Sequence, residues 1–189
     1  MRILLVAVLI GISIAFEENV HGHSDSSSLE LNDDKPTWIR PTLQLPKFGS
    51  KAVLNAELKN EGVSRFTSSN FKKGIVKHIV LFKLKDTVTA KQALEVKRQF
   101  FALKVLCKRD GQPYIESIDG GDQYGGEDVN GGFQYAFIVT FKSEGDRNYY
   151  VGEPIVTHSS FYDPAHQRFK EFVSLFLADD GALVFDFRV

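Results

Sequence analysis

The chain has 189 residues, of which 43% are hydrophobic and 25% charged, and 23 basic against 24 acidic side chains give it a formal net charge of -1. These figures predict one globular domain with room for an appendage, and they exclude collagen-like, coiled-coil and wholly disordered proteins. With balanced charge and no basic patch, nucleic acid is not an expected partner.

The first residues predict export. Met1-Arg2 is followed by a mostly apolar run from Ile3 to Ile14. This pattern is typical of a secretory signal peptide, and the run is shorter than the ~20 residues that a membrane-spanning helix needs, although a retained anchor is the alternative. Cleavage is expected between Ala15 and Gly22. We therefore assign residues 1–22 as signal peptide and expect a secreted, extracellular protein without a membrane partner after cleavage.

Residues 23–74 differ in composition from the rest of the chain. Ser24 to Ser28 is polar and low in complexity, and the segment holds three of the six prolines. A polar linker or pro-segment is predicted here. One short helix is expected within it, from Lys51 to Asn60, with Gly62 as its stop.

A strand and a long helix open the region 75–189. Ile75 to Leu84 is rich in β-branched and aromatic residues and apolar on both alternating faces, which predicts a strand buried on two sides. Thr89 is the expected N-cap of an amphipathic helix that runs to about Lys108. Cys107 falls on its apolar stripe, so a buried structural thiol is favoured over a nucleophile.

Two further strands are predicted at Tyr114 to Gly120 and Phe133 to Lys142. The loop between them contains six glycines, but no helix or Lys-Ser/Thr follows it and it carries several carboxylates. We interpret it as a mobile connection and predict no phosphate or metal site there.

Two more helices and one more strand are predicted after residue 142. A helix is predicted at Glu144 to Tyr150, followed by a polar insertion at 152–162. Asp163-Pro164 is a strong helix start, and Leu183 to Val189 alternates as a last strand. The order βαββαβ predicts an α+β, ferredoxin-like fold.

This fold leaves one face of its sheet without helices. We expect that face to be rich in phenylalanine, with Phe133, Phe137 and Phe141 as interface or core, and to be buried in a homodimer. Two such sheets facing each other close a dimeric αβ barrel, whose interior is either packed or a ligand cavity.

Three segments resemble a known family. They are Val76 to Phe82, Gly132 to Phe141 with Asp146 to Tyr150, and Asp163-Pro164-Ala165-His166. Together they are similar to the stress-responsive A/B barrel (Dabb) domains over residues 75–189. The resemblance implies a dimeric αβ barrel. The family includes stress proteins without a known reaction and enzymes such as olivetolic acid cyclase, which needs no cofactor.

The resemblance also implies site residues. His166 matches the general base of the cyclase, and a helix N-terminus favours a neutral imidazole. His78 matches a cavity-lining histidine. Because the 152–162 insertion is expected to move Tyr149 and Tyr150 away from His166, Tyr162 is the candidate tyrosine partner. A local hydrogen bond for His166 and a satisfied buried position for His78 are the structural alternatives.

We therefore expect a secreted homodimeric stress-response module whose barrel holds a small apolar ligand, without cofactor or metal. The alternatives are a cofactor-free polyketide cyclase or lyase using His166, and an interaction protein acting through its N-terminal extension. The candidate ligand-contacting residues are Phe82, Phe133, Tyr135, Phe137 and Phe141.

Overall fold

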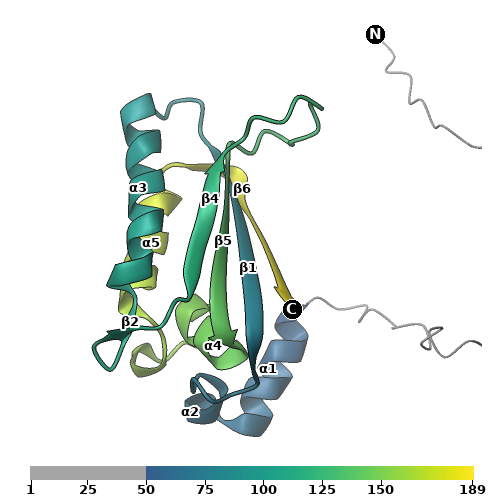
Figure 1. Ribbon diagram of the computed structural model, residues 1–189, viewed down its shortest axis with the longest axis vertical. Coiled ribbons are helices and arrows are strands. Elements are labelled where there is room, and N and C mark those ends of the chain that lie inside the picture. The colour runs from purple at the N-terminus through teal and green to yellow at the C-terminus, as the bar shows by residue number, and fades with distance from the viewer. Residues whose placement is uncertain (1–49) are drawn as a thin grey trace, which may run out of the picture. The chain divides into compact units, whose positions relative to one another are not determined.

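The structure is a computed structural model that describes residues 50–189. Four strands form one antiparallel sheet in the order β4-β5-β1-β6 (Figure 1). Their bounds are Lys73–Leu84 for β1, Ser117–Asp122 for β4, Tyr135–Ser143 for β5 and Leu177–Arg188 for β6. With helix α3 (Ala90–Leu106) after β1 and helix α5 (Pro164–Ser174) before β6, the order is βαββαβ, so the predicted ferredoxin-like fold is confirmed.

The central strands follow from the hydrophobic pattern. β1 pairs with β5 on one side and with β6 on the other, which explains why it is apolar on both faces. The last strand begins six residues earlier than predicted, at Leu177, which pairs with Leu84. Within this strand Asp180 takes a positive φ, beside a shift in the β1–β6 register.

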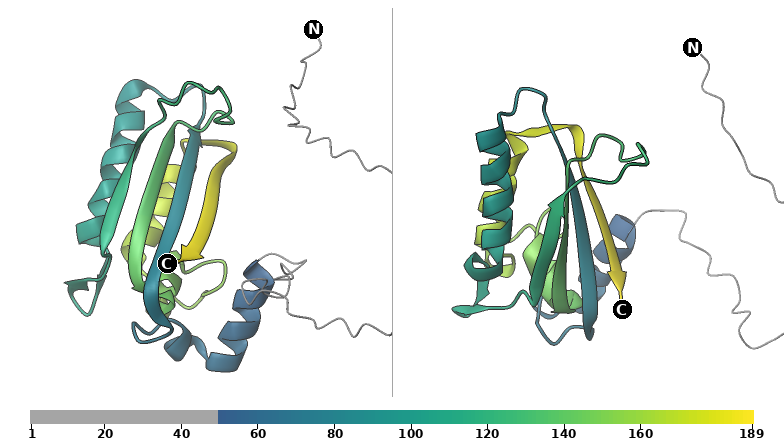
Figure 2. Two further views of the ribbon diagram at one scale, coloured as in Figure 1. Left: turned by 45° about the vertical axis from the view of Figure 1, so that its right-hand side comes forward. Right: turned by 45° about the horizontal axis from the view of Figure 1, so that its top comes forward.

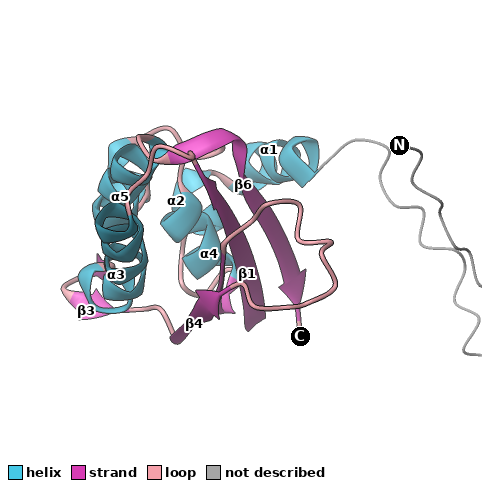
Figure 3. Cartoon of the chain, turned by 90° about the horizontal axis from the view of Figure 1, so that it is seen from above, coloured by secondary structure: helices cyan, strands magenta, loops and turns pink. Residues whose placement is uncertain are grey.

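Helices α3 and α5 begin where their caps predict and pack on the same face of the sheet (Figures 2 and 3). Thr89 forms a capping box with Gln92 at the start of α3. Asp163 caps α5 by accepting hydrogen bonds from the backbone of the first turn.

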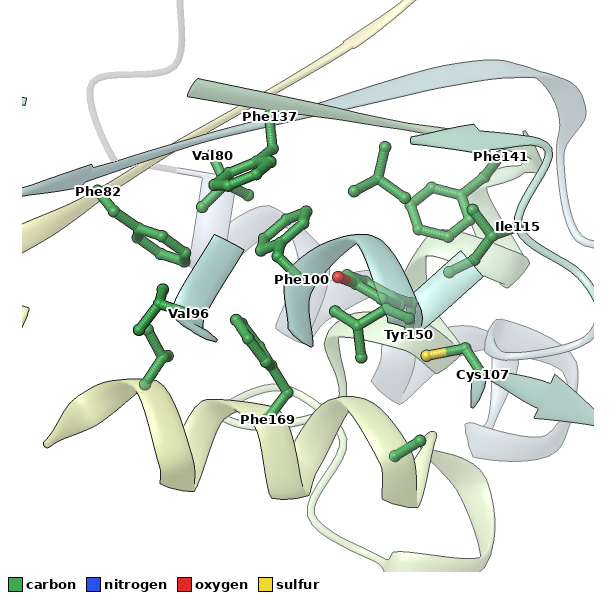
Figure 4. Packing of buried hydrophobic residues seen from close by; sticks show 14 of the residues in the cluster. Val80, Phe82, Val96, Phe100, Cys107, Ile115, Phe137, Phe141, Tyr150 and Phe169 are labelled. Atoms are coloured by element: carbon green, nitrogen blue, oxygen red, sulfur yellow. The ribbon is translucent and has the colours of Figure 1, made fainter. Parts of the chain in front are cut away.

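The phenylalanines lie on the opposite side of the sheet from the one expected. Phe137 and Phe141 are fully buried in the core between the sheet and the helices (Figure 4), and the Phe137 ring stacks on Phe100 with centroids 3.9 Å apart. Phe133 precedes β5 and lies in the loop. The prediction of an uncovered face built on these three residues is wrong, because the parity of β5 directs its aromatic side chains toward α3 and α5.

The face without helices is nevertheless apolar. Strand β6 supplies most of it, since its register places Leu183, Phe185 and Phe187 on the side away from the helices, and 59% of Phe185 is exposed. Ile79 of β1 lies beside Phe185 on the same face, and Ile138 of β5 lies on the other side of Ile79.

Part of the predicted linker is folded. Helices α1 (Ser50–Glu61) and α2 (Val63–Phe66) precede β1, and the expected helix at 51–60 is confirmed. Phe66 and Phe71 pack with Val156 of the insertion in a second apolar cluster. The 50–72 segment and the insertion at 152–162 therefore bury each other's apolar side chains.

Short elements complete the described chain. Helix α4 (Glu144–Val151) follows β5 directly, strands β2 (Lys108–Arg109) and β3 (Gln112–Pro113) form a small hairpin, and a 3₁₀ helix, η1 (Ser159–Phe161), lies in the insertion. No helix among residues 50–189 is long and apolar enough to span a membrane. The predicted signal peptide and residues 23–49 lie outside the described residues.

Candidate ligand-binding and acid-base site

A cavity of about 410 Å³ lies between α5 and the helix-side face of β1 and β6. Ten of its fourteen lining residues are apolar, and the other four are His78, Glu153, His166 and Lys170. A mostly apolar wall with a few polar groups is the usual composition of a small-molecule site.

The cavity is exposed along strand β6. This strand forms an edge of the sheet, and Ala182 and Val184, which line the cavity, are both exposed, Val184 by 56%. By contrast, α3 and the core phenylalanines fill the β4–β5 half of the same face. The space therefore arises where small side chains on an edge strand meet α5.

His78 enters the cavity wall from β1. Strand alternation places it on the helix side with Val80, and the antiparallel register sets it directly opposite Asp186 of β6. Its Nδ1 atom lies 2.6 Å from Asp186 Oδ1, and the other carboxylate oxygen accepts a hydrogen bond from the Arg147 guanidinium. Asp186 therefore links a buried histidine to a buried arginine.

The charge state of Asp186 fixes the direction of this hydrogen bond. Burial acts to raise its pKa, but the hydrogen bond from His78 and the charges of His78 and Arg147 together lower the pKa below the usual 3.8. Asp186 is thus ionised at neutral pH and accepts a hydrogen bond from His78 Nδ1. Within the described chain, His78 Nε2 has no hydrogen-bond partner and remains available to a ligand.

His166 sits in the first turn of α5, where its own Nδ1 lies 2.6 Å from the backbone oxygen of Tyr150. A carbonyl oxygen can only accept, so Nδ1 carries the proton. Burial, followed by the charges of His78 and Lys170, lowers the pKa of His166 well below 6.5. The imidazole is therefore neutral at pH 7, with an unprotonated Nε2, as the helix position predicted.

Tyr150, not Tyr162, accompanies His166. The two rings stack with centroids 3.6 Å apart, although the insertion was expected to separate them. The expectation fails because the two ends of the inserted loop lie next to each other. The backbone N–H of Asp163 donates a hydrogen bond to the carbonyl oxygen of Tyr149 at 2.9 Å, which keeps the start of α5 beside the end of α4. Tyr162 packs against the second apolar cluster and does not line the cavity.

The hydroxyl of Tyr150 is a buried polar group without a hydrogen-bond partner among the described residues. Burial raises its pKa well above 10, so it stays protonated. Its ring also meets His78 edge to face, with centroids 5.6 Å apart. Tyr150 therefore separates the two histidines, and its ring fixes the orientation of both.

Asp163 acts as a helix cap. One carboxylate oxygen accepts from the backbone of Ala165 and His166, and the other accepts from Tyr114 Oη at 2.8 Å. Its carboxylate makes no hydrogen bond to the His166 imidazole. The nearby Cys107 is fully buried, and burial raises the pKa of its thiol, which confirms a structural cysteine.

The predicted aromatic ligand residues separate into three groups. Phe82 lines the cavity beside His78, whereas Phe137 and Phe141 are core residues that do not reach it. Phe133 and Tyr135 line a different pocket, of about 450 Å³, under the glycine-rich loop.

Sequence reasoning missed Asp186, Arg147 and Lys170. Asp186 is the one carboxylate between Leu183 and Val189 and shares a strand face with Val184, which was a usable signal. Its pairing with His78 needed the β1–β6 register. Lys170 follows His166 by four residues on a helix, so the sequence already placed both on one face.

A second pocket, of about 430 Å³, adjoins the first. It shares His78, Val151 and Val184 with the cavity and adds Arg147 and Asp186. Leu54 and Phe66 from the two N-terminal helices close its far side. Among residues 50–189 there is no cluster of three or more His, Cys, Asp or Glu side chains that would hold a metal ion.

The chain is similar to one protein family and to several solved structures. A family model described as the stress responsive A/B barrel domain, Dabb, matches residues 76–189. A hydroxynitrile lyase from Passiflora edulis is similar at 22% identity, with 62% of this chain and 94% of that chain covered and a TM-score of 0.49. An Arabidopsis thaliana protein is similar at 24% identity, with 60% and 94% covered and a TM-score of 0.47.

A third solved structure, from Bacteroides fragilis, is described as a dimeric protein of unknown function with a ferredoxin-like fold. It is 22% identical, with 63% of this chain and 100% of that chain covered and a TM-score of 0.42. No curated protein matches the chain.

Proposed function

Because the chain belongs to the stress responsive A/B barrel (Dabb) domain family, we propose that it works as a homodimer that binds a small, mainly apolar molecule. The binding site is the cavity between β1, β6 and α5. The observation that carries this proposal is a largely apolar cavity with two imidazoles in its wall, each held in place through Nδ1.

The two histidines suit the polar end of such a ligand. Each Nδ1 already has a partner, so only Nε2 is left, and an unprotonated Nε2 can accept a hydrogen bond from a hydroxyl group. The apolar remainder of the ligand would contact side chains such as Phe100, Phe169 and Val173. Burial of that surface supplies affinity, at roughly 25 cal/mol per Å² before the entropic cost of binding is subtracted.

Filling the cavity tests the site. We expect 1-octanol to bind the full-length mature protein, measured by titration calorimetry and by shifts of backbone amide signals near α5. Ala182→Trp should abolish binding, because the indole occupies the space beside Val184. Ala90→Trp, at the exposed start of α3, should bind as the unaltered protein does. Equal octanol affinity in both variants contradicts the proposed site.

The exposed sheet face supports the homodimer. Leu183, Phe185 and Phe187 are each more than 40% exposed on a face that no helix covers. Exposed apolar surface of this kind marks an interaction site. Phe185→Asp should give a monomer in analytical ultracentrifugation, whereas Leu94→Asp, which changes an equally exposed leucine on α3, should stay dimeric. A dimeric Phe185→Asp protein would show that another surface associates.

A second function, acid-base catalysis, is favoured by the His78–Asp186 pair. A carboxylate hydrogen-bonded to Nδ1 stabilises the imidazolium that forms when Nε2 takes a proton. His166 lacks such a carboxylate, and burial disfavours its charged form. The geometry therefore favours His78 as general base and His166 as a neutral hydrogen-bonding group, in a cofactor-free lyase or cyclase acting on a carbonyl compound.

Proton exchange tests this without knowledge of the substrate. In D2O, His78 would take an α-proton from octanal, the enolate would form, and a deuteron from solvent would replace the proton, which proton NMR follows. We expect His78→Ala and Asp186→Asn to lower the exchange rate by roughly a hundredfold, and His166→Asn by less. Loss of exchange only in His166→Asn would return the base to His166, and exchange no faster than in buffer would contradict catalysis on such carbonyls.

Secretion is a further proposal, supported by the basic and apolar pattern of residues 1–22. N-terminal sequencing of the protein from culture medium should give a start between residues 16 and 23. Retention of the intact chain in the cell would contradict it.

A further inference from the structure

Lys170 is a cation in the wall of the apolar cavity that the acid-base site does not use. It lies one helical turn after His166 on α5, so the two side chains share a face. Its Nζ donates hydrogen bonds to the backbone oxygens of Val151 at 3.1 Å and Glu153 at 3.2 Å. An ammonium group has three N–H donors, so one remains for a ligand.

No acidic side chain forms an ion pair with this ammonium. Among residues 50–189, none of the salt bridges involves Lys170. Glu153 also lines the cavity, but its backbone oxygen is the atom that meets Lys170, and its side chain is exposed. The cation is half-buried, and burial lowers its pKa, although the charges of Glu153 and Glu171 act to raise it. An anion placed beside it would restore the favourable interaction that water no longer supplies in full.

Of the other polar residues that line the cavity in the described chain, only Glu153 is acidic, and its side chain is exposed to solvent. His78 and His166 present ring nitrogens, and neither brings a carboxylate into direct contact with Lys170, since Asp186 is already occupied by His78 and Arg147. A neutral ligand would leave the third donor of Lys170 without a partner, which costs binding free energy in a desolvated site.

We propose that the ligand of this cavity is a monocarboxylate with an apolar tail, whose carboxylate pairs with Lys170 while the tail lies between α5 and β6. This inference rests on the proposed binding function and names its ligand class. The chain itself holds the ammonium in this position, because the last residue of α4, Val151, and Glu153 of the insertion supply the two carbonyl oxygens that it contacts.

Matched ligands and a charge-removing variant test the proposal. Titration calorimetry on the full-length mature protein at pH 7.5 compares octanoate with 1-octanol, which differ in the charged group. We expect octanoate to bind about tenfold more tightly, the factor that one charge-assisted hydrogen bond supplies at a half-buried site. Lys170→Gln keeps an N–H donor for the backbone oxygens but removes the charge, so octanoate affinity should fall about tenfold and octanol affinity should stay within twofold.

Lys91→Gln, on the exposed surface of α3, removes an equal charge at a residue that does not line the cavity and should change neither affinity. Equal binding of octanoate and octanol by the unaltered protein, or an unchanged preference in Lys170→Gln, overturns the carboxylate proposal and leaves the apolar site in place. Equal loss of both ligands in Lys170→Gln also overturns it, because Lys170 would then only support the turn at 151–153. If neither ligand binds the unaltered protein, the proposed function fails as well.

Discussion

Acidification should destabilise this protein through His166, and the size of the effect can be worked out. The folded state holds the imidazole neutral because its pKa lies well below 6.5, whereas the unfolded chain takes up a proton near pH 6.5. The unfolded state then binds more protons below that pH. The contribution of the neutral, buried histidine to the free energy of unfolding is therefore present in full above pH 6.5 and is lost as the pH falls below that value.

The magnitude follows from proton linkage. One proton taken up only by the unfolded state lowers the free energy of unfolding by about 1.4 kcal/mol per pH unit below pH 6.5, and very little above it. Between pH 7.5 and 5.5 this amounts to about 1.4 kcal/mol. Asp186 does not contribute in this range, because its lowered pKa matters only below its ordinary value of 3.8.

Urea unfolding at the two pH values measures the effect. His166→Asn keeps an N–H donor near Nδ1 for Tyr150 O but cannot be protonated, so its free energy of unfolding should fall by about 1.4 kcal/mol less than that of the unaltered protein. Circular dichroism at one fixed protein concentration follows the transition, since the proposed dimerisation would make stability depend on concentration. His158→Asn, at an exposed histidine of the insertion, should keep the original pH dependence. If His166→Asn shows that same dependence, the imidazole is not held neutral by the fold.

Two further predictions concern packing. Phe137→Ala should lower the free energy of unfolding by about 3–5 kcal/mol, because it leaves a cavity against Phe100. Phe133→Ala, in the loop, should lower it by under about 1 kcal/mol. Similar losses for the two variants in urea unfolding would contradict the assignment of Phe137 to the core. Gly145→Ala should destabilise by roughly 1–3 kcal/mol, because a Cβ there would lie 1.8 Å from the Ser68 backbone oxygen; an unchanged melting temperature would show that α4 and the 67–72 turn are not in contact.

Local signals in the sequence placed most of the elements. Alternation identified the central strands, and capping residues such as Thr89 and Asp163 marked where the helices begin. The family match over residues 76–189 then agrees with the resemblance read from three short segments. Both kinds of signal are local, because periodicity and caps act over one or two turns or a few strand residues.

Only part of the candidate site could be predicted from the sequence. His78 and His166 were named from the sequence, and both line the cavity. Their partners were not, because Asp186 meets His78 only through the β1–β6 register, and Tyr150 meets His166 only because the insertion returns to the end of α4. Neither contact can be predicted from the spacing of these residues in the sequence.

The amino-acid sequence by itself determined the order of helices and strands, the burial of Cys107 and which two histidines to consider. Only the tertiary structure decided that the phenylalanines of β5 face the helices and that a cavity forms beside β6. It also decided that His78 carries a carboxylate partner. The reason is physical: alternation says that a strand has two different faces, but which face meets the helices depends on the register and packing of residues far apart in the chain.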